Sequence, residues 1–304
     1  MVSASRFQLE SIPPPTPPAS GRGVFSAFVA IDWSGAKGRR HKGIAIAEAR
    51  GDRAPRLVRP GHAWSREEVA DWLLDRAKLE PTLFGFDFSF APPITERGDY
   101  LPGEPGVPRN AREFWAYVDA LSGDEDLGAA SFLETAHRKH FYFGIADGVK
   151  ADFMHFRACD ARLNAQGGRK TASAYDAIGA AQVAKASFSG MRLLNRLAGK
   201  VAIWPMDPLP ECGSAVAEIY TRIYIRRAGL SGSKIRSRDE LNRALKALGS
   251  APARLRFEPD DHQSDALITA AGMHQLARIE PSAFAPTGLT PDIAQTEGWT
   301  FGVL

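Results

Sequence analysis

The stretch "AFVAIDWSGAKGRRHKGIAIAEA", residues 27–49, contains two short apolar runs joined by a basic turn that includes glycine. A third run, "RLVRP", follows the turn "GDRAP". Connections this short join antiparallel neighbours, so we expect the chain to open with a three-stranded antiparallel meander. The first run ends on Asp32, and an acidic residue at the end of a buried strand requires an explanation.

The next segments predict a helix and a second buried strand. In "SREEVADWLLDRAKLEP", Ser65 and Glu68 have the spacing of a capping box, which predicts a helix. In "TLFGFDFSFAPP" the residues are apolar on both faces, which is typical of a central strand covered by helices. Residues 91–170 have no regular pattern apart from a predicted helix at "AREFWAYVDAL", and we interpret them as an insertion of helices and loops.

Regular patterns return after the insertion. The segment "SAYDAIGAAQVAKASFSGMRLLNRLAGK" predicts a helix with a break near Ser189 and Gly190. Strands are predicted at "VAIWP" and "AVAEIYTR", and helices at "RDELNRALKALG" and "DHQSDALITAAGMHQLARI". This order predicts an α/β fold with a mixed central sheet and helices on both faces. We expect residues 25–304 to form a single domain, preceded by a flexible proline-rich extension at residues 1–24.

Composition restricts the class of protein. Of the 304 residues, 44% are hydrophobic and 24% are charged, as in globular proteins with a sizeable core. Two cysteines are too few for a disulfide framework, and no apolar run is long enough to cross a membrane. We therefore expect a cytoplasmic protein. The net charge is only +3, but the clusters "KGRRHK" and "RRAGLSGSKIRSR" are either a polyanion-binding surface or an ordinary solvated face.

Four acidic residues stand in apolar surroundings: Asp32, Asp87, Glu218 and Asp265. Each one alone is explained as a turn residue or as the partner of an arginine. A buried carboxylate is costly unless it is paired or bound to a cation, so convergence of several would require a metal. Carboxylate oxygens suit Mg²⁺ or Mn²⁺, and two such ions can stabilise the attacking and leaving oxygens in phosphodiester hydrolysis.

Histidines add one candidate. His262 precedes Asp265 by three residues, so the two side chains should share a helix face, where the imidazole could deprotonate or position a water. An exposed histidine in the first helical turn is the alternative interpretation. His137 and His140 in "HRKH" are too isolated in the sequence to indicate metal ligands. The sequence has no nucleophile elbow, Walker-type loop or dinucleotide-binding glycine pattern.

The order of elements and acids resembles the RNase H-like fold, in which the first catalytic acid lies on the first strand and the last on the final helix. More narrowly, the chain resembles the family known as domain of unknown function 429, predicted to be RNase H-like nucleases. The resemblance is carried by "VAIDWSGA", "GFDFSF", "YDAIGAAQVAKASFSGMRLLNRL", "VAIWPMDP", "AEIYTR", "HQSDALITA" and "EGWTFG". It implies a site at Asp32, Asp87, Glu218 and Asp265, and "HQSD" is similar to the His-x-x-Asp of RuvC-type nucleases. One departure is Thr221, where the family favours proline.

The leading hypothesis is a metal-dependent nuclease, or a related phosphodiester hydrolase, that acts on DNA or RNA with two Mg²⁺ or Mn²⁺ ions held by the four acids. Candidate phosphate contacts are Lys37, Arg39, Arg40, Arg222, Arg226, Arg227 and Lys234. Two alternatives stay open: a nucleic-acid or nucleotide-binding module of the same fold without catalysis, and an actin-like or sugar-kinase-type ATP-binding protein. The glycine turn in "DWSG" loosely favours the latter, but no second phosphate-binding turn accompanies it.

Overall fold

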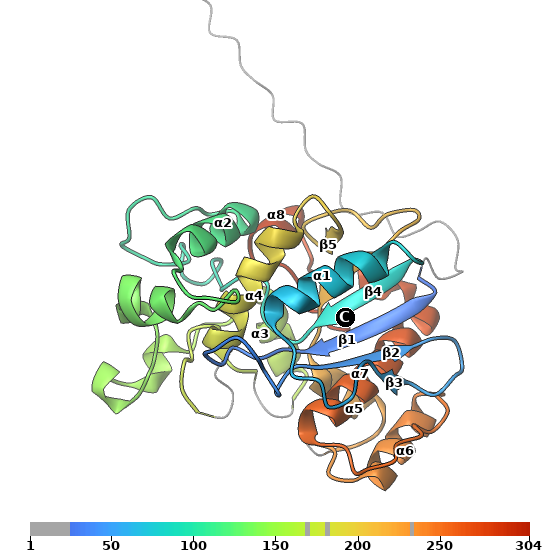
Figure 1. Ribbon diagram of the computed structural model, residues 1–304. Helices are drawn as coiled ribbons and strands as arrows, with labels where there is room; N and C mark the ends of the chain where they lie inside the picture. Colours follow the sequence, from blue (N-terminus) through green and yellow to red (C-terminus); the bar gives the residue numbers. More distant parts are fainter. Residues whose placement is uncertain (1–24, 168–170, 180–182, 232–233) are drawn as a thin grey trace, which may run out of the picture.

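Six strands form one mixed sheet at the centre of the computed structural model, which describes residues 25–167, 171–179, 183–231 and 234–304 (Figure 1). In spatial order the strands are β3 (Arg56–Leu57), β2 (Ala45–Ala49), β1 (Ala27–Asp32), β4 (Thr82–Phe86), β6 (Ala215–Glu218) and β5 (Ala202–Trp204). The pairs β3/β2 and β2/β1 are antiparallel, and the remaining pairs are parallel. The predicted meander and the central position of β4 are therefore confirmed. The predicted extension at residues 1–24 lies outside the described residues.

Helices cover the sheet and extend beyond it. The α-helices are α1 (Arg66–Ala77), α2 (Ala111–Leu121), α3 (Ala158–Ala165), α4 (Val183–Leu197), α5 (Thr221–Arg227), α6 (Arg238–Ala247), α7 (Asp261–Ile279) and α8 (Pro291–Thr296). Five short turns complete the elements: the π-helical η1 (Phe132–Ala136) and the 3₁₀ turns η2 (Arg138–His140), η3 (Ile145–Asp147), η4 (Lys150–Phe153) and η5 (Pro281–Phe284). Among the described residues, no helix is both long enough and apolar enough to span a membrane.

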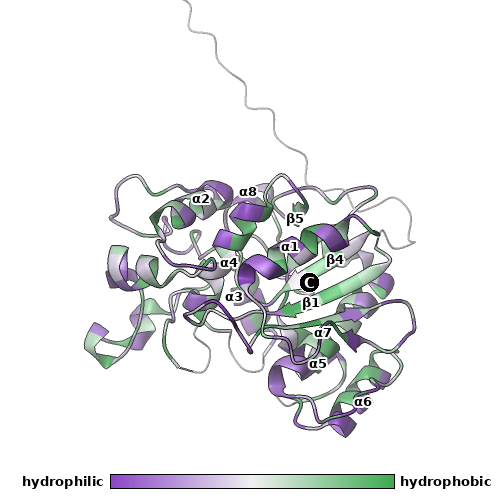
Figure 2. Ribbon diagram, in the orientation of Figure 1, coloured by the Kyte–Doolittle hydropathy of each residue, from purple (hydrophilic) through white to green (hydrophobic). Residues whose placement is uncertain are grey.

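The two faces of the sheet bury different side chains. On one face Ile31 and Phe86 belong to a cluster that includes the apolar sides of α1, α2 and α4. On the other face Ala30 and Ala217 belong to a cluster that includes α5, α6 and α7. Figure 2 shows the apolar strands β1 and β4 among helices that carry both polar and apolar residues. Helices on both faces of a mixed sheet, as the sequence predicts, are thus confirmed.

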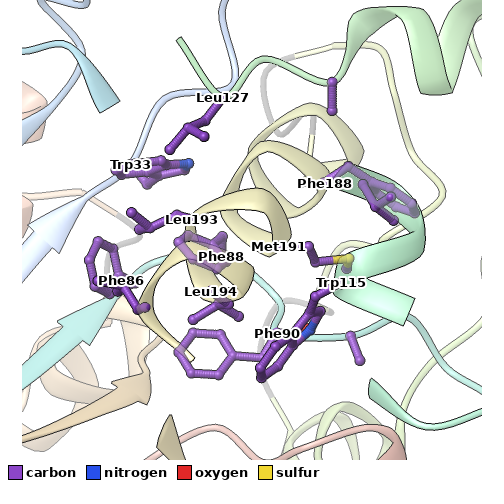
Figure 3. Packing of buried hydrophobic residues seen from close by; sticks show 14 of the residues in the cluster. Trp33, Phe86, Phe88, Phe90, Trp115, Leu127, Phe188, Met191, Leu193 and Leu194 are labelled. Carbon is purple, nitrogen blue, oxygen red and sulfur yellow. The ribbon is translucent and has the colours of Figure 1, made fainter. Parts of the chain in front are cut away.

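Three predicted boundaries were wrong. The helix predicted from Ser173 is not helical at residues 173–179, and α4 has Val183 as its first residue. Helix α4 continues through Ser189 and Gly190 without a break, because Gly190 allows the helix to contact the ring of Phe88: a Cβ atom there would lie 2.3 Å from the ring. Figure 3 shows Phe88 between α4 and the aromatic side chains Trp33 and Phe86. The strand predicted at "AVAEIYTR" ends at Glu218, and the chain enters α5 at Thr221.

The insertion predicted at residues 91–170 lies between β4 and α4 and contains α2, η1 to η4 and α3. The helix predicted at "AREFWAYVDAL" is α2, and the side chain of Asn110 caps it by accepting a hydrogen bond from the backbone of Arg112 at 2.9 Å. In Figure 1 the insertion gathers on the side toward which β1 and β4 point. It therefore borders the carboxyl ends of the parallel strands, where open α/β sheets bind their ligands.

Candidate functional site

Asp32 and Asp87 lie side by side at the carboxyl ends of β1 and β4. Asp32 is the last residue of β1, and Asp87 follows β4 and donates its backbone N–H to the carbonyl of Ile31 at 3.1 Å. Ile31 and Phe86 are register partners and face α4. Because successive side chains in a strand alternate between faces, Asp32 and Asp87 point to the opposite face, which α7 covers.

Helix α7 brings His262 and Asp265 to the same edge. The helix begins where the sequence predicts, because Asp260 and Gln263 form a reciprocal capping box, with Asp260 accepting from the backbone of Gln263 at 2.8 Å. His262 and Asp265 share one face of its first turns. The Nδ1 atom of His262 lies 2.7 Å from Oδ2 of Asp32. The predicted association of His262 with the acids is present in the structure.

Small residues in the sheet allow α7 to approach the strands closely. Ala30, Gly85 and Ala217 form one row across β1, β4 and β6 on the α7 face. A Cβ atom at Gly85 would lie 2.8 Å from the side chain of Met273 in α7. This close packing of helix and sheet places the first turns of α7 against the strand ends that carry Asp32 and Asp87.

The negative charge of the three aspartates exceeds the positive charge of the side chains around them. Burial and the nearby Asp32 raise the pKa of Asp265 from 3.8 to about 7. Burial raises the pKa of Asp87 well above its ordinary value, and the charges of Asp32, Asp265 and Glu218 raise it further. Burial also raises the pKa of Asp32, against the opposing hydrogen bond from His262. Like charges in a partly buried site disfavour ionisation of one another, so the site favours a bound cation.

His262 is the exposed member of the group. Its side chain is 51% accessible, compared with 15% for Asp32. The hydrogen bond to Asp32 raises the pKa of the imidazole, and its burial opposes this. Because Nδ1 is engaged with Asp32, Nε2 is the nitrogen that remains for a water or a substrate.

Two threonines that sequence reasoning did not assign to the site support Asp87. The hydroxyl of Thr221 donates to Oδ2 of Asp87 at 3.4 Å, and the hydroxyl of Thr269 donates to that of Thr221 at 3.0 Å. Thr221 is the first residue of α5, and Tyr220 before it is in the extended conformation. A proline, the residue that the resembled family favours here, would fit this backbone, so the departure at Thr221 leaves the local geometry intact.

Glu218 belongs to a different set of contacts. It is the register partner of Phe86, which places its side chain on the face opposite to Asp32 and Asp87. Arg157 donates to both carboxylate oxygens at 2.6 Å, and the hydroxyl of Thr300 and the backbone of Phe90 donate at 2.6 and 2.8 Å. Both oxygens of Glu218 are thus engaged within the protein, although its charge still acts on Asp87.

Two of the predicted phosphate contacts lie near the aspartates. The ammonium group of Lys234 forms an ion pair with Asp261 in the first turn of α7. Its charge opposes the rise in the pKa values of Asp32 and Asp265. Arg222 follows Thr221 in the first turn of α5. These two cationic residues border the carboxyl edge that the acids occupy.

The remaining predicted phosphate contacts lie in other surroundings. Those of the turn after β1 form ion pairs with acidic residues: Lys37 with Glu134, Arg39 with Glu125 and Arg40 with Glu68. Arg226 donates to the carbonyl of Gln166, and Arg227 pairs with Glu280 at 4.0 Å. Glu280 caps the C-terminus of α7, about 22 Å along the helix axis from Asp265 at the α-helical rise per residue, so Arg227 lies far from the acids.

The carboxylate oxygens of Asp32, Asp87 and Asp265 do not all lie within 4.8 Å of one another. Among the described residues, the only three metal-ligating side chains whose ligand atoms all lie within 4.8 Å of one another are Glu104, His137 and His140, which sequence reasoning set aside. Two ions that share ligands do not require all carboxylates within this spacing, because the ions themselves are about 3.5–4 Å apart. The two-ion site at the sheet edge stays a prediction.

Comparison of the chain with family models, with curated proteins and with solved structures gave no match.

Proposed function

We propose that this protein is a metal-dependent phosphodiester hydrolase, and specifically a nuclease that acts on DNA or RNA. The observation that carries the proposal is the group of three partly buried aspartates, Asp32, Asp87 and Asp265, at the carboxyl edge of the sheet beside His262. The residues fit hard divalent cations, because every acidic donor is a carboxylate oxygen and the site has more negative charge than its cationic neighbours compensate.

In this proposal Asp32, Asp87 and Asp265 would hold Mg²⁺ or Mn²⁺. Such ions, when bound, activate a water and stabilise the charge that develops on the phosphate. Glu218 is left out of the ligand set, because both of its oxygens accept hydrogen bonds from the protein. Glu218 instead joins the start of α3 to the sheet through Arg157, and it holds the segment after β4 through the backbone N–H of Phe90.

His262 contacts Asp32 through Nδ1, and its side chain is half exposed, so Nε2 is the nitrogen that can accept a proton from a water. Lys234 and Arg222 border this edge, and we propose that they contact the phosphate backbone. Nucleic acid would reach the site at the exposed side chain of His262.

The finer fold assignment belongs to the same proposal. The order β3-β2-β1-β4-β6, the three antiparallel strands at the start and the acids on β1 and α7 agree with the RNase H-like arrangement that the sequence resembles. Membership of the family known as domain of unknown function 429 would follow from the same features. The additional strand β5 extends the sheet at its parallel edge.

The test is a cleavage assay with labelled single-stranded and double-stranded DNA, RNA, RNA/DNA hybrid and four-way junction, each with Mg²⁺, with Mn²⁺ and with a chelator. We expect cleavage by the wild-type protein in the presence of a divalent ion. D32N and D87N should each reduce the rate at least about 100-fold, because each removes charge stabilisation worth several kcal/mol. D292N, at an exposed acid in the first turn of α8, is the matched control and should retain the wild-type rate.

Absence of cleavage on every substrate with both ions would overturn the proposal. Binding of nucleic acid without cleavage would identify instead a non-catalytic module, and cleavage that persists in D87N would assign the chemistry to other residues.

A further inference from the structure

A second group of metal-binding side chains lies in the insertion and shares no residue with the aspartates at the sheet edge. Glu104 comes from the loop between β4 and α2, His137 follows η1, and His140 ends η2. The two histidine side chains are buried, with 7% and 6% of their surface accessible, and that of Glu104 is 20% accessible. The group is thus largely buried, and Glu104 is its most accessible member.

The ligand atoms of the three residues converge. Nε2 of His140 lies 3.1 Å from Oε1 of Glu104, and Nδ1 of His137 lies 4.0 Å from the same oxygen. All three ligand atoms lie within 4.8 Å of one another. Donors around a tetrahedral zinc ion with bonds near 2.05 Å are about 3.3 Å apart, so small side-chain rotations would close the group around one ion.

An orphaned nitrogen points to a missing ligand. Nδ1 of His137 is buried and has no hydrogen-bond partner among the described residues. Its other nitrogen, Nε2, lies 3.1 Å from the hydroxyl of Tyr117. With the Nε2 proton donated to Tyr117, Nδ1 carries a lone pair directed away from that hydrogen bond. A histidine that binds a metal usually donates its second nitrogen to an oxygen in this way.

Lys139 is the competing cation. Its ammonium nitrogen lies 2.8 Å from Oε1 of Glu104, while 66% of its side chain is accessible to solvent. A flexible exposed lysine can turn into water at little cost, whereas the buried Nδ1 of His137 has no such alternative. The lysine therefore satisfies Glu104 and leaves the histidine unsatisfied.

We propose that Glu104, His137 and His140 form a binding site for one Zn²⁺ ion. Two imidazole nitrogens and one carboxylate oxygen are a donor set that Zn²⁺ accepts, with a fourth position left for water. Mg²⁺ prefers a set made only of oxygens, which distinguishes this site from the aspartates of β1, β4 and α7. The ion would join the loop before α2 to η1 and η2, and would therefore stabilise the insertion.

The experiment titrates the full-length, chelator-treated protein with Zn²⁺ by calorimetry, and with Co²⁺ by visible absorption, which reports tetrahedral coordination. We expect the insertion to bind one equivalent of Zn²⁺ that D87N retains, whatever Zn²⁺ the aspartates at the sheet edge also take up. E104Q and H140N should each weaken binding by more than the roughly 10–100-fold that loss of an outer-shell partner costs. Circular dichroism of the metal-free variants verifies folding, and E104Q, at a partly exposed side chain, is the safer variant in this respect. K139M should bind Zn²⁺ more tightly, because it removes the competing cation.

Two controls separate this site from the rest of the protein. His155 lies 3.1 Å from Glu96 in the same insertion, so H155A removes a comparable histidine–carboxylate pair and should leave Zn²⁺ affinity unchanged. D87N should also leave the Zn²⁺ affinity unchanged. The zinc site can therefore be refuted without refuting the nuclease site, and the reverse also holds. Absence of Zn²⁺ binding by the wild-type protein, or equal affinities for wild type, E104Q and H140N, would overturn the proposal.

Discussion

Replacing Asp265 by asparagine preserves the shape of the side chain and removes a charge that the metal-free protein accommodates poorly. Burial and Asp32 raise the pKa of Asp265 from 3.8 to about 7. At about 1.4 kcal/mol per pKa unit, the ionised carboxylate lowers the stability of the folded protein by at most about 4.5 kcal/mol, and the water that reaches this partly buried group reduces that cost. We therefore expect D265N to raise the free energy of unfolding at pH 8 by about 1–3 kcal/mol.

The sign of the pH dependence follows from proton uptake. Between pH 4 and pH 7 the folded protein holds a proton on Asp265 that the unfolded chain has released, so the stability of the metal-free protein falls as pH rises across this range. D265N lacks this group, and its decline in stability should be shallower. At pH 4 the folded wild-type protein is neutral at this position, as D265N is, so the two proteins should be almost equally stable.

The assay is urea unfolding followed by tryptophan fluorescence, in the presence of a chelator, at pH 4, 6 and 8. D261N is the matched control on the same helix: Asp261 is paired with Lys234, which lowers the pKa of that carboxyl, so its replacement should lower stability at pH 8. A loss of stability in D265N at pH 8 would refute the reasoning, because it would mean that the carboxylate of Asp265 has a favourable partner in the metal-free protein.

Three further substitutions test the packing around the site. G190A should lower the free energy of unfolding by about 1–2 kcal/mol in thermal or urea melts, because its clash with Phe88 outweighs a gain in helix propensity of about 1 kcal/mol. E218Q should lower the free energy of unfolding by about 3 kcal/mol, because it weakens the buried ion pair with Arg157. The folded fraction should still bind Mg²⁺, and loss of Mg²⁺ binding would instead identify Glu218 as a ligand. T221P should fold with a circular dichroism spectrum like that of the wild type, and an unfolded product would refute the assignment of this residue to the first position of α5.

Much of the fold could be predicted from the sequence because its elements have strong local signals. The meander follows from short apolar runs with short connections, and the helix predicted at "DHQSDALITAAGMHQLARI" has the bounds of α7, which a capping box begins. The prediction failed where a tertiary contact overrides a local preference. Gly190 weakens a helix in isolation, but in α4 it creates space for the ring of Phe88.

The candidate site could be predicted only in part. His262 and Asp265 share a helix face because of their spacing, and the structure places them beside Asp32. The side chain of Glu218 could not be assigned to a face, because the pairing register of β4 and β6 is absent from the local sequence. Its partner Arg157 lies 61 residues away in the chain and carries no signal of its own.

The group in the insertion had still less local signal. His137 and His140 are close in sequence, but Glu104 comes from an irregular loop 33 residues before His137, a separation that no periodicity reveals. Only the folded arrangement shows that the three ligand atoms converge and that one imidazole nitrogen lacks a partner.

The central claim is that the aspartates at the sheet edge bind divalent cations, and titration of the chelator-treated protein with Mg²⁺ in a calorimeter tests it most directly. Mg²⁺ is the suitable probe because it prefers carboxylate oxygens to the imidazole nitrogens of the insertion. The wild-type protein should bind Mg²⁺, E104Q should bind it equally well, and D87N should bind it far more weakly. Titration curves for the wild type and D87N that coincide, or no binding by either, would contradict the account.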